Sequence, residues 1–190
     1  MVTRFAPAAV LALTATALLA GPAHASTAYH SGPIGYTCTT PGSPALAVTL
    51  LAGFTGPDTV APGAAFAISE VSGSVTLSPA ARAYFTAGGN DGVLGGFTAA
   101  FIEAANAPRS STTSAPNVPA LWGPDPVAID FHNGKQTHRA GASGTVTFRA
   151  DRLAVALSLH RPDGAPAGPA LVCTQVAGQD ASFTPALPIT

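Results

Sequence analysis

The sequence predicts an all-β protein, a two-sheet immunoglobulin-like β-sandwich of about seven to nine strands with one short helix. Three observations support this fold class. Apolar side chains recur at every second position in several segments, which is the pattern of half-buried strands. Dipeptides typical of tight turns separate those segments. Two cysteines lie near the two ends of the region that carries the pattern, and a bridge between them would tie its first and last strands together.

Residues 1–25 have the three parts of a secretory signal peptide. Arg4 supplies a positive charge, residues 5–20 are rich in Ala and Leu, and Ala23-His24-Ala25 gives the small-x-small cleavage pattern. The apolar run of 16 residues is shorter than the roughly 20 residues that cross a bilayer. We therefore expect cleavage after Ala25, a secreted product that is free or associated with the cell surface, and no transmembrane segment in the mature chain.

The remaining chain has the length of one domain with its own core. We expect a flexible N-terminal segment at residues 26–35 and a single β-sandwich domain over residues 36–190. Within that domain, residues 106–126 are rich in Pro, Ser and Thr and have no hydrophobic periodicity, so we expect a long loop there.

The two cysteines, Cys38 and Cys173, are expected to form a disulfide. Export places the chain in an oxidising compartment, where two cysteines have one intramolecular pairing. The bridge would bring the first and last strands of the domain within about 6 Å, measured between Cα atoms. A catalytic thiol is the competing interpretation, and two flanking cysteines fit it poorly.

Alternation predicts the strands in order along the chain. In residues 153–160, the apolar side chains Leu153, Val155, Leu157 and Leu159 share one face of the clearest strand. In residues 47–54, Val48, Leu50, Ala52 and Phe54 do the same. The other strands are expected at residues 66–71, 74–77, 97–102, 127–132, 145–148 and 171–174.

One helix is predicted directly after the strand at residues 74–77. Ser78 is a favourable N-cap, Pro79 suits the first helical position, and Gly88 ends a run of helix-forming residues. Asn133-Gly134 is a strong turn signal and predicts the end of the strand that begins at residue 127.

Trp122 is the one tryptophan and lies in the expected loop. The loop could cross from one sheet to the other with Trp122 packed over the open end of the core. It could instead display Trp122 as the anchor of a binding surface. The packed arrangement is favoured, because a lone tryptophan is more often buried than displayed.

Several short segments, taken in order, resemble a family of secreted actinobacterial domains of unknown function. They are residues 36–41, 60–63, 71–77, 144–148 and 171–174, with a cysteine in the first and in the last. The resemblance implies a disulfide-closed β-sandwich on or outside the cell surface. It implies no catalytic residues, because none are assigned in that family.

Composition and motifs exclude several function classes. Only 9 % of residues are charged and Lys135 is the one lysine, so a nucleic-acid partner is not expected. The sequence lacks the Gly-x-Ser-x-Gly elbow, the His-Glu-x-x-His metal motif, the P-loop and the EF-hand loop. We therefore expect neither an enzyme nor a bound cofactor.

Asp130, His132 and His138 are the one local cluster with ligand chemistry. Asp130 and His132 are two apart and share a strand face, and a turn at Asn133-Gly134 could bring His138 back beside them. Two imidazoles and a carboxylate could bind a transition metal. A solvated hairpin face without a ligand is the favoured interpretation, because three such residues without a spacing motif are common by chance.

These observations predict a secreted or cell-envelope-associated β-sandwich protein with a structural or binding role. Its partner would be a cell-wall component, a glycan or a protein. The alternative is a surface adhesin or carbohydrate-binding module that uses Trp122 and the long loop.

Overall fold

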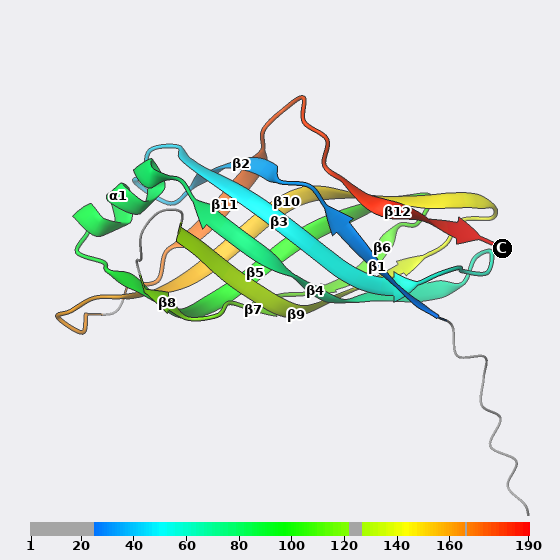
Figure 1. The fold of residues 1–190 in the computed structure, drawn as a ribbon, viewed down its shortest axis with the longest axis horizontal. Helices are drawn as coiled ribbons and strands as arrows, with labels where there is room; N and C mark the ends of the chain where they lie inside the picture. Colours follow the sequence, from blue (N-terminus) through cyan, green and yellow to red (C-terminus); the bar gives the residue numbers. More distant parts are fainter. Residues whose placement is uncertain (1–24, 122–126, 166) are drawn as a thin grey trace, which may run out of the picture.

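The computed structural model describes residues 25–121, 127–165 and 167–190 (Figure 1). Residues 1–24, on which the signal-peptide prediction rests, and Trp122 lie outside the described residues. No helix in the described ranges is both long enough and apolar enough to cross a membrane.

The described chain is almost entirely β-structure. Five strands of 12 residues or more run along the length of the molecule: β3 (Leu46–Pro57), β4 (Ala65–Leu77), β5 (Gly92–Ala105), β9 (Val127–Arg139) and β10 (Gly144–His160). The shorter strands are β1 (Ser26–Ser31), β2 (Ile34–Thr39), β6 (Arg109–Thr113), β7 (Ala115–Pro116), β8 (Ala120–Leu121), β11 (Ala170–Gln175) and β12 (Ser182–Ile189).

All of these strands belong to one antiparallel sheet, where the sequence predicted two. The sheet curves around the core because two pairs of short strands connect its two broad halves. On one side, β4 pairs with both β9 and β3, and β3 pairs along its other edge with β1 and β2. On the other side, β10 pairs with β5 and, along its other edge, with β11 and β12. The β2–β11 and β1–β12 pairings join the halves.

The middle of the chain also corrects the sequence prediction. Residues 106–126 were expected to be a long loop, but they contain β6, β7 and β8. The backbone N–H of Asn117 donates to Gly96 in β5, and that of Val118 donates to Asp130 in β9. This segment therefore closes the ring of hydrogen-bonded strands. Its strands were not predicted because they are short and their side chains do not alternate.

The expected strand count of seven to nine also differs from the twelve strands of the described chain. Residues 26–35, expected to be flexible, form β1 and begin β2, because Tyr29 is buried and its ring stacks on Phe54 with centroids 4.8 Å apart. Two pairs of predicted strands merge into β4 and β10, since their breaks are register shifts and not turns.

The predicted helix forms as α1 (Pro79–Ala87), at one end of the molecule (Figure 1). The Ser78 hydroxyl accepts a hydrogen bond from the backbone N–H of Ala81, and Pro79 occupies the first turn. Ala81 and Phe85 are the buried residues of the helix. The cap, the proline and the terminating glycine are all local signals, which explains why the sequence located this element.

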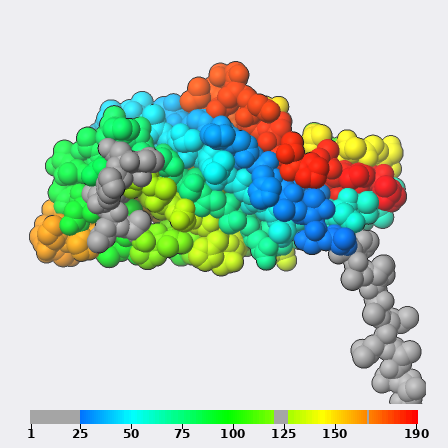
Figure 2. All heavy atoms as spheres, in the orientation of Figure 1, coloured from blue at the N-terminus to red at the C-terminus, as the bar shows by residue number. Residues whose placement is uncertain are grey.

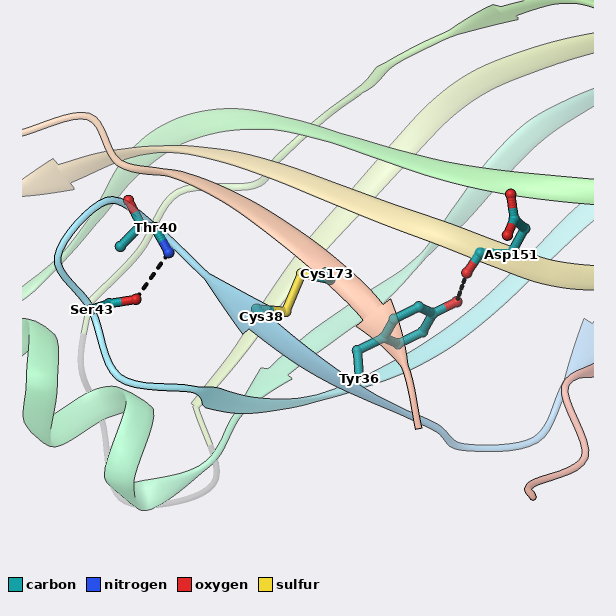
Figure 3. Close-up of a disulfide and its surroundings, with 6 residues drawn as sticks. All are labelled: Tyr36, Cys38, Thr40, Ser43, Asp151 and Cys173. Carbon is teal, nitrogen blue, oxygen red and sulfur yellow. Dashed lines mark hydrogen bonds between the residues drawn. A yellow bond between two sulfur atoms is a disulfide. The ribbon is translucent and has the colours of Figure 1, made fainter. Parts of the chain in front are cut away.

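The predicted disulfide between Cys38 and Cys173 is present (Figure 3). The two residues are direct partners in the β2–β11 pairing, with Cα atoms 3.9 Å apart. The bridge spans 135 positions, for which the chain-entropy model gives on the order of 4–5 kcal/mol of stabilisation. Beside it, the hydroxyl of Tyr36 donates to the backbone oxygen of Asp151 in β10 at 2.9 Å. Burial raises the pKa of Tyr36 to about 12, so the phenol keeps the proton it donates.

Candidate functional site

The structure separates the three residues of the predicted metal cluster. β9 does not turn at Asn133-Gly134 but continues through it, with Asn133 at a φ of 72° and register shifts in the β4–β9 pairing at this point. Before this bulge the odd-numbered residues of β9 face the core, and after it the even-numbered residues do. Asp130 and His132 therefore face solvent, while His138 is fully buried.

The prediction that Asp130, His132 and His138 could meet is wrong. The two histidines are six positions apart along an extended strand, which is about 20 Å of chain. The described part of the chain contains no group of three His, Cys, Asp or Glu residues that could hold a metal ion.

His138 is instead part of the aromatic core. Its ring stacks on Phe66 with centroids 5.5 Å apart and meets the edge of Phe148 at 6.1 Å. Its Nδ1 lies 3.1 Å from the backbone oxygen of Ala107. Burial lowers the pKa of His138, the charge of Arg109 lowers it further, and the bond to Ala107 opposes both effects. A neutral imidazole suits this apolar surrounding.

Asp130 and His132 lie in a groove on the opposite, outer surface of β9. The groove crosses β1, β3, β4 and β9, and its volume is about 750 Å³. Figure 2 shows the face of the molecule that these four strands form. His30 from β1 lies on one side of the groove and the two β9 residues lie on the other.

Strand register explains which side chains share the groove. His30 is opposite Gly53, and Gly53 is opposite Ser72, so these residues form a row across three strands. A second row runs beside it, from Leu51 through Ser74 to Asp130. The central residues of the two rows, Gly53 and Ser74, are small. The surface of the sheet is therefore depressed between the larger side chains on either side, and this depression is the floor of the groove.

Two glycines keep that floor low. A Cβ on Gly53 would lie 2.8 Å from Nδ1 of His30, so the imidazole lies over the bare backbone of β3. A Cβ on Gly73 would lie 1.9 Å from the backbone oxygen of Leu51, which no side chain could tolerate. Close backbone approach between β3 and β4 therefore depends on glycine at position 73.

The polar side chains of the groove have few protein partners. Among the described residues, His30, Asp130 and His132 make no side-chain hydrogen bond or ion pair. Glu70 accepts one hydrogen bond from the Thr55 hydroxyl at 3.2 Å. No lysine or arginine lines the groove. The site thus combines two carboxylates, two imidazoles and several hydroxyls, with most of their hydrogen-bonding capacity available to a ligand.

Two of the four titratable residues in this groove, Asp130 and His132, belong to the cluster predicted from the sequence, whereas His30 and Glu70 were not predicted. Those two residues lie in other strands, and only the pairing of β1, β3, β4 and β9 brings them to the same surface. The expectation of no enzymatic activity stays a prediction.

Comparison with known proteins places the chain in a family. A family model described as "Family of unknown function (DUF6801)" matches residues 35–184. Neither the curated proteins nor the solved structures gave a match. The matched region begins at the start of β2, includes both cysteines and ends within β12. Since the model covers more than half of the sequence, the chain belongs to this family of unknown function, DUF6801.

Proposed function

We propose that the protein is a secreted or cell-envelope-associated binding protein whose outer groove takes a polar ligand that carries amino groups. One observation carries the proposal: the groove holds the carboxylates of Glu70 and Asp130, and no lysine or arginine lines it. Uncompensated carboxylates in a concave site create a negative potential that attracts cations. An ammonium group could donate charge-assisted hydrogen bonds to either carboxylate.

The remaining lining residues suit the rest of such a ligand. The hydroxyls of Ser72 and Ser74 can both donate and accept hydrogen bonds, and the imidazoles of His30 and His132 offer further hydrogen-bonding nitrogens. The phenyl rings of Phe54 and Phe131 are buried beneath the groove, so aromatic stacking is not available there. Recognition would therefore depend on hydrogen bonds, on charge and on apolar contact with the exposed side chain of Leu51.

Other features support the proposed location and scaffold. A buried disulfide between distant parts of the chain is typical of an oxidising compartment outside the cytoplasm. The sequence of residues 1–25 supports export by the same route. The two broad halves of the sheet enclose one core, which supports the sandwich-like interpretation of the scaffold.

A matched pair of oligosaccharides tests the proposal. A glucosamine tetramer and the N-acetylglucosamine tetramer of the same linkage differ at each nitrogen, which is an ammonium group in the first and an uncharged acetamide in the second. Calorimetric titration of residues 26–190 should show tighter binding of the glucosamine tetramer. Asp130→Asn and Glu70→Gln should each weaken that binding about fivefold or more.

Asp58→Asn is the matched control, because Asp58 is an exposed carboxylate that does not line the groove. It should leave the affinity unchanged. Equal binding of the two tetramers, or equal losses from Asp130→Asn and Asp58→Asn, would contradict the proposal.

A further inference from the structure

A second cavity, which unlike the groove is lined by arginines, lies where β5, β6 and β10 meet. Its volume is about 360 Å³, and its polar lining side chains are Glu103, Arg109 and Arg149. The seven basic residues that follow residue 25 are scattered along the sequence, yet the fold brings Arg109, Arg149 and Arg152 to this one surface.

An aromatic ring holds two of these arginines in place. The Cζ of Arg109 lies 5.2 Å from the centroid of Phe101, and the Cζ of Arg152 lies 5.4 Å from it. Guanidinium groups at this distance are attracted to the electron-rich face of the ring. Arg109 also donates from Nη1 to the backbone oxygen of Ile102 at 3.3 Å. These contacts restrain the Arg109 side chain at the edge of the cavity.

Arg149 differs from its neighbours because its guanidinium has no such contact. Its strand partner is Glu103, a pairing that commonly produces a cross-strand ion pair. No hydrogen bond or ion pair joins Arg149 to Glu103 or to any other described residue. An exposed guanidinium with its donors unused therefore lines the cavity beside a second, restrained one.

Three carboxylates limit the positive potential of this surface. Glu103 lines the cavity, and Oδ2 of Asp151 lies 3.5 Å from Nε of Arg152. Hydrogen bonds from Ser182 hold the pKa of Asp180 below its usual range, and the charge of Arg149 lowers it further. Asp151 and Asp180 do not line the cavity, so Glu103 is the one acidic residue that would face an occupant.

We propose that this cavity binds an oxyanion, a carboxylate or phosphate group of a small ligand, through Arg149 and Arg109. The planar guanidinium fork matches both groups with two parallel hydrogen bonds. Arg149 supplies the unused donors, Arg109 supplies a second positive charge, and Glu103 lowers the affinity by repulsion. The site therefore contains residues with opposite effects on the same ligand. Substitutions that remove these charges should change the affinity in opposite directions.

Titration of residues 26–190 with inorganic phosphate and with acetate tests the proposal, each against sodium chloride of equal ionic strength. Arginine side-chain NMR signals report the binding directly. We expect saturable shifts for Arg149 and Arg109 with at least one of the two anions. Saturation by phosphate alone identifies a phosphate site, and saturation by acetate alone identifies a carboxylate site.

Three variants give the decisive comparison. Arg149→Gln should weaken binding about tenfold, and Glu103→Gln should strengthen it severalfold, because each removes one charge of opposite sign. Arg82→Gln is the control, since Arg82 lies in α1 at the other end of the molecule (Figure 1). Melting temperatures confirm that each variant is folded.

The proposal is overturned if neither anion shifts the arginine signals in a saturable way. It is also overturned if Arg82→Gln weakens binding as much as Arg149→Gln, because the effect would then come from net charge. A Glu103→Gln variant that binds more weakly than the wild type would likewise contradict it.

Discussion

The two halves of β9 place similar polar residues in opposite environments. Before the bulge, Asp130 and His132 face solvent in the groove and have no protein partner among the described residues. After it, Gln136 and His138 face the core and hydrogen-bond to backbone atoms of neighbouring segments. The sequence spacing of the two histidines is even, which would place them on one face of a regular strand. The extra residue at the bulge places them on opposite faces instead, because side chains along a strand alternate with a period of two.

Insertion of one alanine between Gly134 and Lys135 should have the largest effect on this comparison. The extra residue would shift the alternation by one position, turning Lys135 and Arg139 toward the core and Gln136 and His138 toward solvent. Burial of unpaired charges is among the most destabilising changes, so we expect a loss of more than about 4 kcal/mol in the free energy of unfolding. Urea unfolding followed by circular dichroism measures it.

Asn133→Gly is the control for the insertion. Glycine adopts the positive φ of this position and keeps the bulge, so the change should be about 1 kcal/mol or less. An insertion variant as stable as the wild type would show that the alternation of β9 does not determine which residues face the core.

Gln136→Leu should have the next largest effect. The Gln136 side chain donates to the backbone oxygen of Ala100 at 2.7 Å and accepts from the N–H of Ile102 at 3.3 Å, both in β5. Leucine would leave both backbone groups buried without a partner, at a cost of about 2–4 kcal/mol in urea unfolding. Lys135→Gln, at the exposed neighbouring position, should cost less than about 0.5 kcal/mol. Equal costs at the two positions would count against the inward direction of Gln136.

His138→Phe should change the dependence of stability on pH. Because burial lowers the pKa of His138, the unfolded chain takes up a proton below about pH 6.5 while the folded chain does not. The wild type should therefore lose about 1.4 kcal/mol for each pH unit as the pH falls from 6.5 toward the lowered pKa.

Phenylalanine removes this proton uptake, so the variant should lose less stability over the same range. His132→Gln, on the exposed half of the strand, should follow the wild type. Parallel curves for His138→Phe and the wild type between pH 6.5 and 5 would rule out a buried neutral imidazole.

Asp130→Asn and His132→Gln should have the smallest effects on stability. Neither side chain contributes a hydrogen bond or ion pair within the described chain, so each change should stay within about 0.5 kcal/mol. Thermal melting at neutral pH provides the measurement. A loss of more than 2 kcal/mol would mean that these residues stabilise the fold and are not reserved for a ligand.

Local patterns predicted the elements that depend on local chemistry. Ser78 and Pro79 located the helix, alternation located the apolar faces of β3 and β10, and the two cysteines predicted the bridge. The bulge at Asn133 was not predictable in the same way, because Asn-Gly more often forms a hairpin turn than a left-handed residue within a strand. The two candidate binding sites were less predictable than the bulge. His30 joins His132 and Arg109 joins Arg149 only through long-range strand pairing, which no local pattern encodes.

Mapping the glucosamine tetramer onto the backbone tests the central claim most directly, namely that the outer half of β9 is a binding surface. Two-dimensional amide NMR spectra of residues 26–190 would be recorded during a titration with the tetramer. We predict saturable shifts in residues 128–132 of β9 and in the groove residues of β1, β3 and β4, with residues 134–139 unchanged. Shifts confined to other surfaces, or no saturable shifts at all, would contradict this account.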